Sequence, residues 1–96
     1  MNRLVLTASL VEIEPLRYTP AGLSAADVLL EHESELKEHG VTRQVKASLR
    51  GRALGELAEK MIKLPLGTQC EFEGFLASPR NSRSIVFHLT QFNQIS

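Results

Sequence analysis

Six segments of this 96-residue chain have a clear hydrophobic period, and their order limits what the chain can fold into. Five of them alternate from one residue to the next with the period of two that is typical of β-strands. The remaining one lies between the third and fourth strands and has apolar residues three and four apart, as a helix does. The predicted order is therefore strand, strand, strand, helix, strand, strand.

Turn-forming residues separate these segments. Pro15 ends the first strand, and the stretch PLRYTPAG at residues 15–22 predicts a loop. Pro65 and Gly67 end the helix, and Gly74 predicts a bulge within the fourth strand. The predicted strands lie in residues 3–13, 24–36, 41–50, 68–79 and 85–95, and the helix lies in residues 52–67.

Five strands with a helix between the third and fourth are the elements of the OB-fold, a five-stranded Greek-key barrel. A chain of 96 residues is long enough for one hydrophobic core, so residues 1–96 are predicted to form a single OB-fold domain of the all-β class. Phe72 and Phe87 fall on the predicted core side of their strands. The OB-fold binds single-stranded nucleic acids or oligosaccharides across its second and third strands and two flanking loops.

Charge is distributed unevenly along the chain, although the formal net charge is zero. Residues 1–40 hold three basic and seven acidic residues, whereas residues 41–96 hold eight basic and four acidic residues. The segment VTRQVKASLRGR, which is the predicted third strand and its exit, has four basic residues and no acid. A local positive field on a neutral molecule is sufficient to attract a polyanion.

Two predicted loops would flank this basic strand in an OB-fold. The loop after the first strand carries Arg17 and Tyr18, and the loop between the last two strands carries two arginines and no acid. A solvated strand face with ordinary surface charges is the alternative interpretation of the same residues. The candidate nucleic-acid-binding residues are Arg17, Tyr18, Arg43, Lys46, Arg50, Arg52, Arg80 and Arg83.

Other classes of function have little support in the sequence. There is no glycine-rich phosphate loop and no nucleophile elbow, so we expect neither an enzyme nor a cofactor. The three histidines and Cys70 lack metal-ligand spacing, and Cys70 is predicted to be a buried thiol. No apolar run is long enough to span a bilayer and the N-terminus does not resemble a signal peptide, so we expect a cytoplasmic protein without membrane contact.

Three stretches together resemble the PriB family, the primosomal replication proteins N, over nearly the whole chain. They are NRLVLTASLVEIEPLRYTPAG, VLLEHESELKEHGVTRQVKASL and GTQCEFEGFLASPRNSRSIVFHLTQFNQI. The resemblance implies a homodimeric OB-fold protein that binds single-stranded DNA and works with the PriA helicase when stalled replication forks restart. It also implies a place at the nucleoid, and it leaves DnaT open as a further partner.

The departures from the family pattern concern base stacking. Family members that bind DNA tightly carry aromatic residues where this chain has Val41 and Lys46. A stacked base contributes about 1–3 kcal/mol, so Tyr18 or Phe75 would have to replace those platforms. We therefore expect weak, salt-sensitive binding, with much of the function carried by the helicase contact.

Two alternatives stay open, and two further surfaces have predicted roles. The chain is a short general single-stranded DNA-binding protein in one alternative, and in the other it is a protein-interaction module whose DNA contact is incidental. The first strand is apolar on both faces and is predicted to form part of a dimer interface. The acidic run from Glu31 to Glu38 is either a site for a basic partner or a solvated hairpin.

Overall fold

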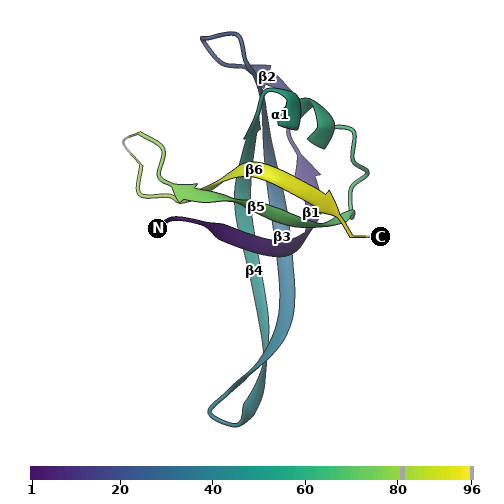
Figure 1. Cartoon of the computed structure of the whole chain (residues 1–96), viewed down its shortest axis with the longest axis vertical. Coiled ribbons are helices and arrows are strands. Elements are labelled where there is room, and N and C mark those ends of the chain that lie inside the picture. Colours follow the sequence, from purple (N-terminus) through teal and green to yellow (C-terminus); the bar gives the residue numbers. More distant parts are fainter. Residues whose placement is uncertain (81, 96) are drawn as a thin grey trace.

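The structure is a computed structural model that describes residues 1–80 and 82–95. It contains one curved sheet and one short helix (Figure 1). The strands are β1 (Leu4–Ile13), β2 (Arg17–Tyr18), β3 (Ser24–Glu38), β4 (Val41–Leu54), β5 (Gln69–Ala77) and β6 (Val86–Gln94), and the helix is α1 (Glu56–Met61).

The sheet closes into a barrel because β1 pairs with two strands. The strand order is β1-β5-β6-β4-β3-β2, and β1 also pairs with β3. Residues 4–9 of β1 lie against β5, and residues 9–13 lie against β3. β4 and β6 run parallel at only two registered positions. This is the predicted Greek-key barrel, with α1 between the third and fourth long strands, so the OB-fold prediction is confirmed.

The β3–β4 hairpin is the longest element and extends well beyond the barrel (Figure 1). Its register runs without interruption from Ala25 opposite Leu54 to Glu38 opposite Val41. The turn consists of His39 and Gly40, both with positive φ, as a tight two-residue hairpin turn requires. The outer half of the hairpin is exposed because its residues are mostly charged or polar on both faces.

The core lies inside the barrel and includes the residues predicted for it. Phe72, Phe87 and Cys70 are fully buried, as expected from their alternation, together with Leu10 and Leu30. Burial raises the pKa of the Cys70 thiol, because a thiolate is poorly solvated there. The helix contributes Ala58 and Met61 to the same core and packs against β3 and β4.

The predicted helix was too long. β4 continues through Arg52 to Leu54, since these residues pair with β3 as far as Ala25. Gly55 then turns the chain with φ of 66°, and α1 spans only six residues. Tertiary pairing therefore overrides the helical spacing of the apolar residues at the start of this segment. The predicted loop at residues 15–22 also contains the two-residue strand β2, which pairs with β3.

The register does shift next to Gly74, where a bulge was predicted, but the extra residue lies on the partner strand β6 and not on β5. The register between β5 and β6 shifts between Glu73 and Gly74, so that Thr90 is the extra residue on β6. A Cβ atom on Gly74 would lie 1.9 Å from the main-chain oxygen of His88. Only glycine fits this close approach of two strands.

No helix in the part of the chain that the structure describes is long and apolar enough to cross a membrane.

Candidate nucleic-acid interface

The basic segment lies on β4, and its side chains divide between two faces. Residues opposite one another in an antiparallel pair share a face. Lys46, Arg50 and Arg52 therefore lie on one face of the hairpin, which we call the outward face, opposite Glu33, Leu29 and Asp27. Arg43, opposite Leu36, lies on the other face. The structure thus brings together three of the four basic residues of this segment and separates Arg43 from them.

Each basic residue of the segment VTRQVKASLRGR has an acidic partner. Arg50 lies 3.8 Å from Glu14, at the end of β1, and Arg52 lies 2.8 Å from Asp27 of β3. Arg43 pairs with Glu38 across the turn of the hairpin. The acids come from the first forty residues, which the β3–β4 pairing folds onto the basic strand.

The outward face of the hairpin is consequently neutral. Four basic residues lie on this face, at positions 37, 46, 50 and 52. Four acidic residues lie on it as well, at positions 27, 31, 33 and 35. The acidic and basic segments are separate in the sequence, but the pairing of β3 with β4 places them side by side, so their charges cancel. The expected positive field does not arise on this face by itself.

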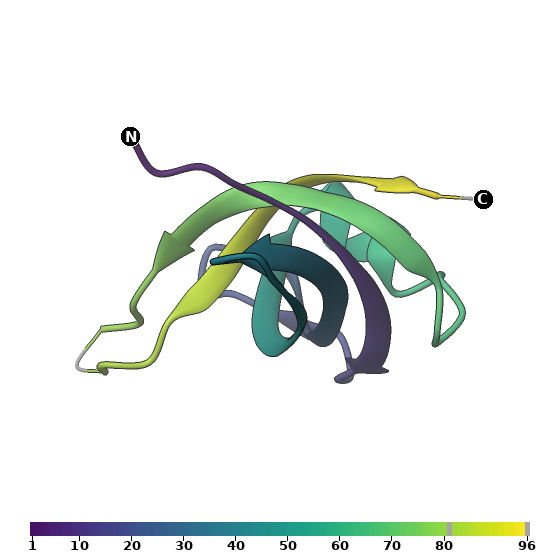
Figure 2. The same ribbon diagram turned by 90° about the horizontal axis from the view of Figure 1, so that it is seen from below.

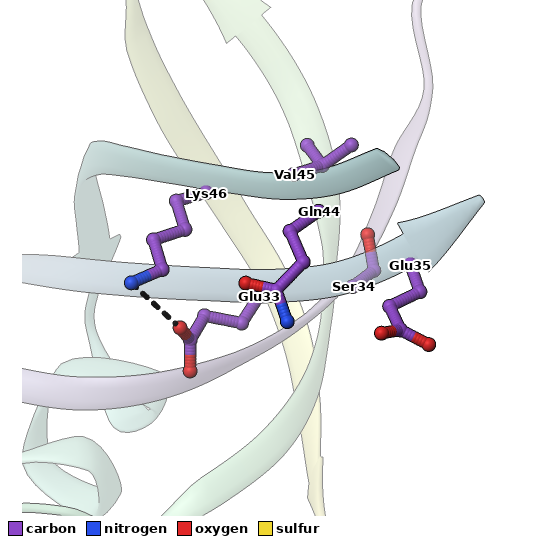
Figure 3. Close-up of a pocket in the computed structure, with 6 residues that line it drawn as sticks. All are labelled: Glu33, Ser34, Glu35, Gln44, Val45 and Lys46. Atoms are coloured by element: carbon purple, nitrogen blue, oxygen red, sulfur yellow. Dashed lines mark ion pairs between the residues drawn. The ribbon is translucent and has the colours of Figure 1, made fainter. Parts of the chain in front are cut away.

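Lys46 lies in a shallow hollow of about 240 Å³ on the outer half of the hairpin (Figure 3). Its Nζ lies 3.3 Å from Oε1 of Glu33, and the two side chains are 70% and 72% exposed. Figure 3 shows Glu35 at the other end of this hollow, apart from the Lys46–Glu33 pair. Such an exposed pair contributes at most about 1 kcal/mol, so another anion can displace Glu33 from Lys46 at little cost.

Asp27 joins three strands at the barrel end of the outward face. Its carboxylate accepts hydrogen bonds from Nε of Arg17 on β2, at 2.9 Å, and from Nε of Arg52 on β4, at 2.8 Å. Burial by itself raises the pKa of Asp27, but the two arginines outweigh that effect and hold the pKa below its ordinary value. Each bond uses one of the five N–H donors of a guanidinium, so both arginines retain donors for a phosphate.

The two loops supply the remaining candidates. Tyr18 is 68% exposed and follows Arg17 on β2. Arg80 and Arg83 are exposed in the β5–β6 loop, and neither is in ion-pair distance of an acid within residues 1–80 and 82–95. Figure 1 shows this loop and the β2–β3 loop projecting from the barrel in different directions.

A depression of about 170 Å³ lies between the paired arginines and the start of β6. Arg50 and Arg52 line it from β4, Glu14 and Asp27 line it from the side of β1 and β3, and Val86 closes it at the end of the β5–β6 loop. The basic strand and the start of β6, which directly follows that loop, therefore border one concavity. Figure 2 shows the barrel from below, with the hairpin in front and the β5–β6 loop to one side.

The sequence analysis missed the acids that face the basic strand and one aromatic partner. Glu33 was part of the acidic run from Glu31 to Glu38, but nothing in the sequence paired it with Lys46. Asp27 lies on β3, which pairs with β4, whereas Glu14 directly follows β1 and reaches Arg50 only because the barrel closes. His88 was not a candidate, yet its ring stacks on Phe75. The alternation of β5 and β6 places both side chains on the outside, which is the signal that pairs them.

Metal binding has no geometric basis in residues 1–80 and 82–95, which hold no group of three His, Cys, Asp or Glu side chains suited to an ion.

Comparison with known proteins gives consistent matches. A family model described as another single-strand binding protein family matches residues 2–91. The replication restart protein PriB of Bordetella pertussis is 43% identical over 100% of this chain and 91% of its own length. The PriB of Nitrosomonas europaea is 34% identical over 92% of this chain and 82% of its own length.

Solved structures show the same relationship. The PriB protein of Ralstonia solanacearum has a TM-score of 0.88 and 36% identity, covering 98% of this chain and 97% of that one. A single-stranded DNA-binding protein of Thermus aquaticus has a TM-score of 0.81 over the whole of this chain and 51% of its own. At 24% identity this second likeness shows the fold alone.

The expectation that the chain is not an enzyme agrees with these matches. The family model spans nearly the whole chain, and two PriB relatives share 34% and 43% of the aligned residues. The sequence, the barrel topology and these matches agree, and the chain belongs to the PriB family of single-strand binding proteins.

Proposed function

We propose that this protein binds single-stranded DNA during the restart of replication and that charge provides most of the binding free energy. The observation that carries the proposal is the alignment of Lys46, Arg50 and Arg52 on the outward face of β4, in a chain of the PriB family. Arg52 and Arg50 border a depression that reaches Val86 at the start of β6, and the β5–β6 loop that ends there carries two further arginines. We call the line from Lys46 along Arg50 and Arg52 to the β5–β6 loop the basic path. A DNA backbone along the basic path would meet basic side chains at both ends.

Binding would proceed by exchange of partners. DNA phosphates would replace Glu14 and Glu33 as partners of Arg50 and Lys46, because exposed ion pairs hold their members weakly. Each neutralised phosphate also releases condensed cations, which drives binding at low salt. The displaced carboxylates remain near the DNA and repel it, so the proposal includes weak and strongly salt-dependent affinity.

Arg17, Tyr18 and Arg43 have smaller parts in this proposal. Arg17 holds Asp27 together with Arg52 and so fixes the barrel end of the path. Tyr18 is exposed beside it and is available to stack on a base. Arg43, on the opposite face of the hairpin, would contact only a strand that wraps around its tip.

We propose further that the protein is a homodimer that links DNA to the PriA helicase, with DnaT as a further candidate partner, in the cytoplasm and at nucleoid replication forks. A free edge of β1 supports the dimer. Residues 4–8 pair with β5 on one side, whereas pairing with β3 begins only at Ser9. The unpaired main-chain groups of such an edge are suited to pairing with a second copy.

A second candidate function is favoured by the neutral outward face of the hairpin. A barrel whose strand cations already have acidic partners would serve as a protein-interaction module that docks a helicase and touches DNA incidentally. A short general single-stranded DNA-binding protein is the third candidate, and it would bind DNA tightly without any need of the helicase.

A salt titration separates these candidates. A fluorescent single-stranded oligonucleotide is titrated at several salt concentrations between about 50 mM and about 300 mM, with PriA titrated in parallel. The proposal expects log K to fall steeply with log salt. DNA affinity that is the same at both ends of this range, together with tight binding of PriA, would establish the interaction module instead.

Substitution then tests the path itself. Replacing Lys46, Arg50 and Arg83 by alanine together should reduce the magnitude of the salt slope by about 2, since each phosphate contact on a single strand contributes about 0.7. The matched control removes Lys60 and Lys63, two exposed bases at α1 and the turn after it, and should leave the slope unchanged. An unchanged slope in the triple variant would place the DNA elsewhere.

A further inference from the structure

Two aromatic rings lie stacked on the outside of the barrel, away from the hydrophobic core. The ring centroids of Phe75 and His88 are 5.1 Å apart and their planes differ by 6°. Phe75 is 40% exposed, whereas its neighbour Gly74 is buried. A large aromatic side chain that is stacked yet open to solvent has a free surface for a further planar group.

The stack is the continuation of the basic path. Arg52 on β4 is registered with His88 on β6, and His88 is registered with Phe75 on β5. Registered residues of neighbouring strands share a face, so the three side chains form one row across three strands. Asp27 holds the Arg52 end of this row in place through a 2.8 Å hydrogen bond.

The stack also lies at the base of the arginine-bearing loop. β5 ends at Ala77, two residues after Phe75, and β6 begins at Val86, two residues before His88. Arg80 and Arg83 belong to the loop that joins these two ends. Cations therefore lie on both sides of the aromatic pair, along the strand row and in the loop.

The architecture of the β5–β6 pair fixes this arrangement. The register shift next to Gly74 brings β5 within contact distance of the His88 main chain, since a Cβ atom at Gly74 would overlap its carbonyl oxygen. This close approach holds Phe75 and His88 opposite one another. The platform is thus built into the sheet and does not depend on the conformation of a loop.

We propose that the Phe75–His88 stack is a nucleobase site, which takes one unpaired base of a single strand whose phosphates lie on Arg52 and on the arginines of the β5–β6 loop. This rests on the proposed function and adds to it a contact with the bases. Stacking accepts every base, because each has a π face. The site would supply the platform that the residues at positions 41 and 46 lack.

The occupant is inferred from charge. A phosphate-linked base fits a platform flanked by arginines, whereas an apolar surface of a second copy would bring no anion to Arg80 and Arg83, which make no ion pair within residues 1–80 and 82–95. Dimer packing on Phe75 is therefore the outcome that would overturn the proposal. It is detected directly, because replacing Phe75 would then change the sedimentation coefficient.

The test compares two oligonucleotides of equal length, oligothymidine and an abasic deoxyribose-phosphate strand. The wild-type protein is expected to bind the base-bearing strand about 5- to 150-fold more tightly, which is the equivalent of one stacked base. Phe75→Ala should remove most of this preference while the salt slope stays unchanged. Phe75→Leu should lose the preference as well. Because leucine keeps the apolar bulk, this variant shows that the loss does not come from misfolding.

Leu66→Ala is the matched control, since Leu66 is an exposed apolar residue in the turn after α1. It should leave the preference intact. A wild-type protein that binds both strands equally, with a normal salt slope, would overturn the nucleobase site and leave the proposed function standing. A wild-type protein that binds neither strand would overturn both. A Phe75→Ala protein that keeps the preference, or that becomes monomeric while the wild type is dimeric, would also overturn the site.

Discussion

Single residues decide how close the strands of this barrel can come and where its charges sit. Gly74 is the clearest case, because the space for its side chain is already filled by the main-chain oxygen of His88. Asp27 is another, since one carboxylate joins arginines from β2 and β4. Asp27 is registered with Arg52 at one end of the row that leads to the Phe75–His88 stack, and Gly74 immediately precedes Phe75 at the other end, so local packing and the candidate site depend on neighbouring residues.

Replacing Gly74 by alanine should lower the free energy of unfolding by about 3 kcal/mol, because the new methyl group must push two main chains apart. Urea unfolding followed by circular dichroism measures the change. The control is Gly22→Ala, where nothing lies within 4 Å but φ is 86°, and left-handed strain alone should lower the stability by about 1 kcal/mol. Equal losses in the two variants would mean that β5 and β6 can separate freely at this point.

The β3–β4 hairpin is the element that determines the electrostatics. It places an acidic strand beside a basic one in continuous register, so Glu33 lies opposite Lys46 and Asp27 lies opposite Arg52. Both sequence segments are strongly charged, yet the surface that they form together is neutral. The hairpin therefore holds Lys46 and Arg52 in ion pairs with acids of the neighbouring strand.

The Glu33→Gln variant should bind single-stranded DNA more tightly than the wild type, by roughly 2- to 5-fold at low salt. Removal of this carboxylate frees Lys46 and deletes a repulsive charge, an effect that salt screens within about 10 Å at 0.1 M. Fluorescence anisotropy at low and high salt measures the gain, which should shrink as salt rises. Glu59→Gln, at an exposed position of α1 that makes no ion pair with Lys46, is the control. Equal affinity of the Glu33 variant and the wild type would show that DNA does not approach Lys46.

The elements that sequence could predict are those that alternation and turn chemistry define locally. The five long strands, a break in the β5–β6 register next to Gly74 and the burial of Phe72 and Phe87 follow from such signals, although the extra residue at that break lies on β6. The start of α1 could not be predicted from such signals, because pairing of Arg52 with Asp27 extends β4 through residues with helical spacing. The acidic partners of the basic strand were likewise hidden, since a contact such as Arg50 with Glu14 depends on barrel closure between distant segments.

At the scale of the whole molecule, the barrel is closed except where β1 leaves β3. His32 donates from Nδ1 to the Thr7 oxygen at 2.6 Å and so ends the ladder between the two strands. Since Val5 and Thr7 lie two apart in one strand, their main-chain groups point to the same side, away from β5. The edge that remains is short, and the Val5 side chain beside it is 44% exposed.

Substitution of Val5 by lysine should therefore dissociate the proposed homodimer without unfolding the protein. A lysine on an exposed strand edge is compatible with a folded barrel, but in a strand-to-strand interface it must be buried beside its copy, where like charges repel. Sedimentation velocity should show a monomer for Val5→Lys and a dimer for the wild type and for Leu66→Lys, a control at another exposed apolar residue. If two hairpins must act together on one DNA strand, the monomer should also lose affinity by 10-fold or more, roughly the gain expected from linking two weak sites. A Val5→Lys protein that sediments as a dimer would exclude this edge as the interface, and the two hairpins would then be related by some other surface of the barrel.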